Sequence, residues 1–385
     1  MAISLLVLHE RWPGATGLSA YHALLRAGAS AHSVTEAETI PLGWGSTGMR
    51  TVGRLVRPGA VQEFNTQLLA RAFQLRPDLF LAFKGTFVHA NTVRALRARG
   101  IRCVNFYPDV SFTVHGPYLA ASLREYDWVF TTKTFGAGDL RDRLGIRRVS
   151  VLAHAFDPEI HRPRQPTAAE EERLGCDASF VGTWSPAKQT LLEALLRAAP
   201  GIRLRVFGSQ WERVSRSSPL ARCCAGHTVT GVEYAIAINC SRINFGLLSE
   251  RRPGASDGDK ITSRTFHIPA AGGCLLHQRT AELQEVLQEG LDCEAFEGVD
   301  ELADKIVGLL ADDARRRAIA ESGLLRVRSA HSWDHRIRQL VGRLQLEGVI
   351  ERDAMDGWNA LGEPWTGPCG SDPGGLARVC DREDT

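Results

Sequence analysis

The chain has 385 residues, with 46 Lys and Arg against 44 Asp and Glu, and 44% of its residues are hydrophobic. This length suits two globular domains, and the scattered arginines argue against a concentrated nucleic-acid surface. The nine cysteines form no CxxC or Cys/His pair at zinc spacing, and no apolar run reaches the roughly 18 residues of a membrane span, so we expect a reduced, metal-free, cytoplasmic protein.

Short apolar segments alternate with helical patterns along the chain, which is typical of parallel sheets covered by helices on both faces. A first Rossmann-like domain is expected over residues 1–158, and Gly100 is placed to end one of its helices. Its predicted strands cover residues 3–8, 78–83, 102–107, 127–132 and 148–153.

Three polar residues follow predicted strands of this first domain. Lys84 follows residues 78–83, and Asp109 and His115 follow residues 102–107. Ligands of open α/β sheets bind beyond the carboxyl ends of strands, so these side chains are candidates for a cleft. Asp109 can equally cap a turn, and His115 can lie in a surface loop. The glycines after the first strand do not match the GxGxxG spacing, which disfavours hydride transfer.

A segment rich in Pro and charge, residues 159–175, predicts a linker to a second Rossmann-like domain over residues 176–350. Amphipathic helices follow residue 300, one of them capped by Ser332, and residues 351–385 are expected to be loosely ordered. The predicted strands of this domain cover residues 177–182, 203–208, 242–248 and 273–277.

The segment "SFVGTWSPAKQTLL" ends a strand at Gly182 and starts a helix capped by Ser185. The start of a helix favours an anion, and Lys188 in the first turn adds a full charge. We expect Gly182, Thr183 and Lys188 to bind phosphate, although Lys188 can equally be a solvated lysine.

The segment "ITSRTFHIPAAGGCLLH" is the second candidate. Asp259, Arg264 and His267 precede a Gly272–Gly273 turn, and such a turn permits close approach of the backbone to a ligand. Pro269 makes the helix before it short or kinked. His267 can also be a partly buried helix residue without a ligand.

Three stretches, "DASFVGTWSPAKQTLLEALL", "RTFHIPAAGGCLLHQRTAELQEVL" and "FEGVDELADKIVGLLADDARRRAIAESGLLRV", resemble the CgeB-like (spore maturation protein) branch of family 1 glycosyltransferases. "RPDLFLAFKG", "FYPD" and "AHAFDPEIHRP" are similar to its first domain and linker. The resemblance implies a GT-B fold of two Rossmann-like domains facing a cleft. It also implies transfer of a sugar from a nucleotide-sugar donor, such as a UDP- or GDP-sugar, held by the second domain.

The resemblance assigns roles to these residues. Gly182, Thr183, Lys188, Arg264, Gly272 and Gly273 would bind the donor; Asp259 would lie near its sugar, and Asp109 and His115 would orient the acceptor. The acceptor can be a glycan, a small molecule or a macromolecule. The reaction is expected to retain configuration and to need no metal or other cofactor.

His267 departs from the family pattern, which has a ribose-binding glutamate at this place. A neutral imidazole still offers one acceptor nitrogen, so we expect a retuned ribose contact and tolerance of Glu there. A nucleotide-sugar epimerase, a phosphorylase and a non-catalytic nucleotide-sugar binding protein on the same fold are the alternatives.

Overall fold

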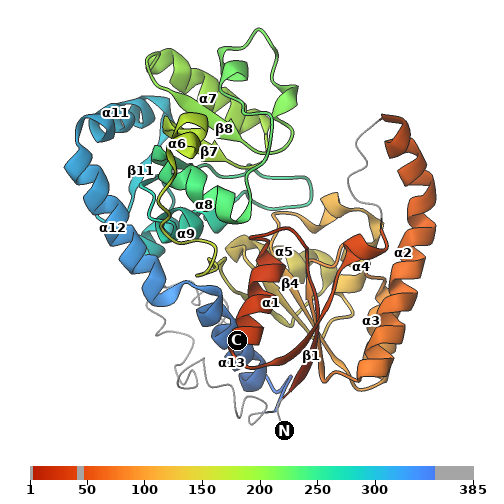
Figure 1. Cartoon of the computed structure of the whole chain (residues 1–385). Helices are drawn as coiled ribbons and strands as arrows, with labels where there is room; N and C mark the ends of the chain where they lie inside the picture. Colours follow the sequence, from red (N-terminus) through yellow and green to blue (C-terminus); the bar gives the residue numbers. More distant parts are fainter. Residues whose placement is uncertain (1–2, 41–46, 352–385) are drawn as a thin grey trace.

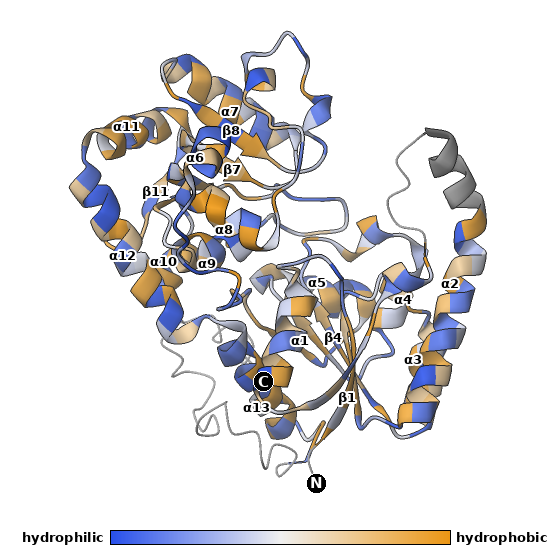
Figure 2. Cartoon of the chain, in the orientation of Figure 1, coloured by the Kyte–Doolittle hydropathy of each residue, from blue (hydrophilic) through white to orange (hydrophobic). Residues whose placement is uncertain are grey.

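The computed structural model describes residues 3–40 and 47–351. These residues form two domains side by side, each a parallel β-sheet between helices (Figure 1). The strands are largely hydrophobic, whereas α3 and the coloured part of α2 mix hydrophobic and hydrophilic residues (Figure 2). This is the arrangement expected when helices cover both faces of a parallel sheet.

The first sheet has the order β2-β1-β3-β4-β5-β6, with every neighbouring pair parallel. The central strand β3 is buried at all five positions, as its sequence LFLAF requires. The strands are β1 (Ser4–Leu8), β2 (Ser30–Val34), β3 (Leu79–Phe83), β4 (Arg102–Tyr107), β5 (Trp128–Thr131) and β6 (Val149–Val151).

The helices of the first domain alternate with these strands. Gly100 follows α3 with a φ of +79°, which confirms its predicted position at a helix end. The helices are α1 (Thr16–Arg26), α2 (Thr47–Leu75), α3 (Ala90–Ala98), α4 (Pro117–Leu123) and α5 (Thr134–Leu144).

The second sheet is also parallel, with the order β11-β10-β9-β7-β8. Ser185 caps α7 with Pro186 in its first turn, as predicted. The strands are β7 (Cys176–Val181), β8 (Leu204–Phe207), β9 (Ser241–Gly246), β10 (Leu275–Gln278) and β11 (Glu294–Phe296). The helices are α6 (Ala168–Leu174), α7 (Pro186–Ala198), α8 (Gly231–Asn239), α9 (Ser263–Ala270), α10 (Ala281–Val286), α11 (Gly298–Ala311) and α12 (Asp313–Ala330).

The last helix, α13 (Trp333–Leu346), returns to the first domain (Figure 1). The Trp333 ring packs edge-on against Phe83 and Phe106, with centroids 5.9 and 5.6 Å apart. Arg26 of α1 also forms a bidentate pair with Asp334, at 2.9 and 3.0 Å. The predicted boundary placed this helix with residues 176–350, whereas its packing joins it to the first domain. Helical periodicity reveals an apolar face but not which sheet covers it.

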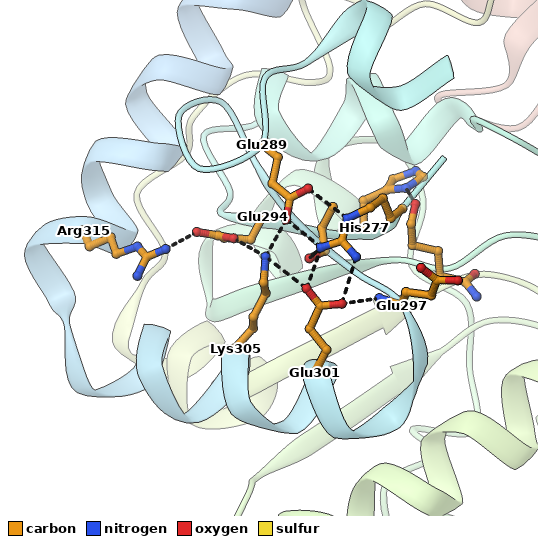
Figure 3. A network of polar contacts seen from close by, with 10 residues as sticks. His277, Glu289, Glu294, Glu297, Glu301, Lys305 and Arg315 are labelled. Carbon is orange, nitrogen blue, oxygen red and sulfur yellow. Dashed lines mark hydrogen bonds and ion pairs between the residues drawn. The ribbon is translucent and has the colours of Figure 1, made fainter. Parts of the chain in front are cut away.

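A network of ion pairs joins the residue after β10, the segment before β11, β11 itself and α11 at the edge of the second sheet (Figure 3). Glu294 of β11 is almost fully buried, and its carboxylate is paired with Lys305 at 2.7 Å and with Arg315. Arg279 joins Glu289 to Glu301 of α11. Because the buried carboxylate is fully paired, this network fixes the edge strand in place.

Candidate functional site

A cavity of about 390 Å³ lies between the two domains, at the carboxyl ends of β7 and β8. The first domain contributes residues of the loop after β1, and the second contributes the loops that lead into α8 and α9. Its lining residues are Trp12, Pro13, Gly14, His161, Val181, Gly182, Thr183, Gly208, Ser209, Thr228, Val229, Thr230, Gly231, Tyr234, Ser263, Arg264 and His267. Four predicted donor-binding residues, Gly182, Thr183, Arg264 and His267, therefore meet in one cavity.

The loops after β7 and β8 are packed tightly where they line the cavity. Gly208 has a φ of +135°, and a Cβ there would lie 2.1 Å from the Gly182 carbonyl oxygen. The indole Nε1 of Trp211 donates to that same oxygen at 2.8 Å. Gly208 is therefore required by both its backbone conformation and the close approach.

Arg264 places a positive charge in the cavity without a carboxylate partner. Its Nη2 donates to the Leu247 carbonyl at 2.8 Å, and its guanidinium lies 5.2 Å from the centre of the Phe180 ring. The Nε atom is buried without a hydrogen-bond partner, and Arg264 forms no ion pair within the described part of the chain. A buried charge is stable when it is paired, so this guanidinium is suited to an anionic ligand.

Lys188 lies beside the cavity but does not line it. Its ammonium donates to the Thr183 carbonyl at 3.2 Å and to Ser249 Oγ at 3.3 Å. Burial, with the nearby charge of Arg264, lowers the pKa of Lys188 to about 8. The sequence assigned this lysine to phosphate; the structure gives it the role of holding the loop that carries Thr183.

His267 is stacked on His161, a linker residue that the sequence did not single out, with ring centroids 3.8 Å apart. The Tyr234 ring meets both histidines edge-on, and its hydroxyl is buried without a hydrogen-bond partner. The prediction missed His161 and Tyr234 because a histidine in a Pro-rich linker and a tyrosine within a helix carry no motif. Only the fold brings them to the cavity.

Backbone groups fix the tautomer of each stacked histidine. His267 Nε2 lies 3.0 Å from the Ala155 carbonyl and must donate to it, because a carbonyl only accepts. The Asp157 amide donates to His161 Nδ1 at 3.0 Å. Burial lowers the pKa of His267 to about 4 and that of His161 well below its usual value, so both rings are neutral. Each ring therefore has one nitrogen left for another hydrogen bond: His267 Nδ1 can accept one, and His161 Nε2 can donate one.

Gly272 and Gly273 lie at the other end of α9, away from the residues that line the cavity. A Cβ on Gly273 would lie 2.4 Å from Ile238 Cγ2. A Cβ on Gly272, which has a φ of +82°, would lie 3.1 Å from Pro163 Cγ. The two glycines permit the turn from α9 to β10 and its packing against α8 and the linker. We expected this turn to contact the sugar donor, but neither glycine lines the cavity between the domains.

Asp259 contacts the first domain. Its Oδ1 lies 2.6 Å from Lys133 Nζ, and both side chains are buried, at 7% and 5% exposure. Lys133 also donates to His154 Nε2 at 3.5 Å, and the Ser249 amide donates to Asp259 Oδ2 at 3.3 Å. The carboxylate predicted to lie near the sugar is thus outside the cavity lining and forms an ion pair across the domain interface. Lys133 and His154 were not predicted.

The other two predicted catalytic residues meet in the first domain. Asp109 Oδ2 lies 3.0 Å from His115 Nε2 and 2.7 Å from Lys84 Nζ. Burial alone would raise the pKa of Asp109, but the hydrogen bond from His115 and the charge of Lys84 lower it well below its usual value. His115 and Lys84 line a second cavity of about 500 Å³. The sequence singled out these three residues separately as candidates for a cleft, and the structure brings them into contact with one another.

Over residues 3–40 and 47–351, no cluster of three or more His, Cys, Asp or Glu residues suits a metal ion. No helix in that part of the chain is long and apolar enough to cross a membrane.

Solved structures with the same architecture cover almost the whole chain. Sucrose-phosphate synthase from Thermosynechococcus elongatus is 14% identical, with a TM-score of 0.61 over 91% of this chain and 100% of that chain. Anabaena HepE in complex with UDP-glucose is 13% identical, with a TM-score of 0.58 over 89% and 100%. A putative UDP-N-acetylglucosamine 2-epimerase from Listeria monocytogenes is 11% identical, with a TM-score of 0.53 over 91% and 98%.

The predicted fold is confirmed by these likenesses: the chain has the GT-B arrangement of two Rossmann-like domains. No curated protein matches its sequence. Residues 187–342, from α7 into α13, match the family model described as glycosyl transferase-like.

Proposed function

We propose that the protein is a nucleotide-sugar-dependent glycosyltransferase, related to the CgeB-like branch, that binds its donor in the cavity between the domains. The observation that carries the proposal is Arg264, a guanidinium inside the cavity without a carboxylate partner among the described residues. The family match over residues 187–342 and the UDP-glucose complex of HepE support a nucleoside diphosphate as the anion it meets.

The cavity offers suitable groups for each part of such a donor. Arg264 and the first N–H groups of α8, whose N-cap Thr230 makes no side-chain capping bond, suit the diphosphate. His267 Nδ1 can accept a hydrogen bond and His161 Nε2 can donate one, so the two atoms suit the two hydroxyls of a ribose. Apolar and small residues such as Val229 leave room for a base.

The proposed reaction breaks the bond between the anomeric carbon and the diphosphate, and forms a bond from that carbon to the acceptor oxygen. Arg264 stabilises the negative charge that develops on the diphosphate. The acceptor oxygen attacks the anomeric carbon on the face from which the diphosphate departs, which retains the configuration, and its proton passes to a departing phosphate oxygen. This step uses no metal. Asp109 and His115 orient the acceptor hydroxyl, and the Lys133–Asp259 pair keeps the two domains in register.

A mass-spectrometric screen tests this function. The protein is incubated with a panel of UDP- and GDP-sugars, with and without EDTA and with candidate acceptors. Transfer or slow hydrolysis of one donor that persists in EDTA supports the proposal. Conversion to an epimer would identify an epimerase, and binding without turnover would identify a binding protein. In either case the transferase proposal is wrong.

A further inference from the structure

The second cavity lies within the first domain, between α2, the loop after β3 and the segment that leads into α4. Three basic side chains, Arg57, Lys84 and His115, are among the residues that line it, and no Asp or Glu is. The lining is therefore positive or neutral, which is the opposite of what a cationic ligand needs.

Lys84 interacts with carboxylates that do not themselves line this cavity. Asp109 pairs with Lys84 and His115, and Glu10 and Glu36 also contribute to the electrostatic environment of Lys84. Burial raises the pKa of Glu36 to about 7, which reduces its negative charge near neutral pH. Lys84 is already paired with Asp109, so it is not the free cation of the site.

Arg57 is the uncompensated charge. It is an exposed residue of α2 that forms no ion pair with any residue of the described chain. Phe87, Tyr118 and the half-exposed Val114 line the same cavity and give it an apolar surface. A cavity that combines a guanidinium with aromatic rings suits a ligand with a ring or chain body and an anionic group.

The backbone of Lys84 supports a functional role for this place. Its φ is +63°, in the left-handed region that non-glycine residues rarely adopt. The conformation is held by the Lys84 amide, which donates to the Phe106 carbonyl at 2.8 Å, and by Asn105 Nδ2, which donates to the Lys84 carbonyl at 3.1 Å. Strain that the surrounding structure maintains is typical of functional sites.

We propose that this second cavity binds the acceptor and that the acceptor carries an anionic group, a phosphate or a carboxylate, which Arg57 contacts. The hydroxyl that receives the sugar would then lie at the Lys84–Asp109–His115 cluster. This inference rests on the proposed function, because it names the acceptor class of that reaction.

Calorimetric titration of the UDP-saturated protein tests it. The probes are glucose, glucose 6-phosphate, glucuronate and inorganic phosphate, at low ionic strength and up to roughly tens of millimolar, because single charge contacts are weak and screened by salt. At least one anionic sugar is expected to bind about tenfold more tightly than glucose, as one charge-assisted contact gives. Comparison of glucose 6-phosphate with glucuronate distinguishes phosphate from carboxylate.

Variants of Arg57 test whether this side chain causes the preference for an anionic sugar. Arg57→Ala should abolish the preference for the anionic sugar, and Arg57→Lys should retain part of it. Arg71→Ala, which changes an exposed arginine on the same helix α2 outside the cavity, is the matched control and should behave as wild type. UDP binding is measured first, so loss of donor binding and loss of anion binding are separate results. Equal or absent binding of all probes, or an unchanged preference in Arg57→Ala, overturns the proposal.

Discussion

The imidazole rings of His161 and His267 are stacked with centroids 3.8 Å apart and an interplanar angle of 21°. Each ring is held by a backbone group, Asp157 N–H for His161 and Ala155 C=O for His267. One side chain comes from the linker and the other from α9, so the stack joins the linker to the wall of the cavity between the domains.

We predict that His267→Ala destabilises the protein and weakens UDP binding. The change leaves the Ala155 carbonyl without its donor, which costs about 1–3 kcal/mol for a buried group. His267→Gln keeps one donor and one acceptor and should recover much of both properties. Chemical denaturation and UDP titration of the two variants provide the measurement, and equal behaviour of Ala and Gln would contradict the hydrogen-bond role.

The structure also changes the expectation for His267→Glu. The sequence suggested that Glu would be tolerated, as in related proteins. A carboxylate at this place would face the Ala155 carbonyl, and an ionised carboxylate cannot donate to it. We therefore predict that His267→Glu is less stable than His267→Gln at pH 7, by the same denaturation measurement. The reverse order would show that the linker can rearrange around a glutamate.

Buried neutral histidines predict a loss of stability in mild acid. The pKa values of His267 and His277 are both lowered to about 4, chiefly by burial, from an ordinary value of 6.5. The unfolded chain binds these protons below pH 6.5 and the folded chain does not, so the stabilisation is full above pH 6.5 and is lost as the pH falls toward 4. Each group contributes a slope of about 1.4 kcal/mol per pH unit in that window.

The free energy of unfolding, measured between pH 7 and pH 4.5, checks this prediction. In His267→Gln the free energy of unfolding should depend less steeply on pH, by about 1.4 kcal/mol per pH unit, because one titrating group has been removed. A slope that is unchanged in this variant would mean that His267 is not the buried neutral ring described above.

The Lys133–Asp259 pair should be coupled across the domain interface. Removing one partner of a buried pair leaves an uncompensated charge and costs about 3–5 kcal/mol. We predict that Asp259→Asn and Lys133→Met each lower stability strongly, whereas the double variant is less destabilised than the sum of the two. Additive effects in this double-mutant cycle would show that the two side chains do not interact in solution.

Lys188→Ala should weaken UDP binding indirectly. The ammonium supports the loop at Thr183 and does not line the cavity, so its removal loosens the loop and also destabilises the domain. Thermal shifts with and without UDP measure both effects. If Lys188→Ala has full stability but does not bind UDP, Lys188 contacts the phosphate directly and the indirect role is wrong.

Much of the sheet architecture could be predicted because apolar runs mark buried parallel strands. The segment LFLAF is an example, since it is apolar throughout and forms the central β3. Two edge strands were missed: β2 has the half-polar sequence SAHSV, and β11 has only three residues, EAF. Edge strands are short and less apolar, so periodicity does not reveal them.

The site was predictable only where local sequence determines position. Gly182 directly follows β7 and Arg264 lies in the first turn of α9, and the structure brings them into one cavity. The turn Gly272–Gly273 is equally marked in sequence but lies at the wrong end of α9. His161 and Lys133 become relevant through contacts between distant segments, which a single sequence does not encode in any local pattern.

Titration of UDP into wild type and Arg264→Gln shows whether the Arg264 guanidinium binds the nucleoside diphosphate. Arg222→Ala, an exposed arginine of the second domain outside the cavity, is the control. We predict that wild type and Arg222→Ala bind UDP alike, and that Arg264→Gln, although folded, binds at least about tenfold more weakly, because it loses a charge-assisted contact. Undiminished UDP binding by Arg264→Gln, or no binding by wild type, would contradict it.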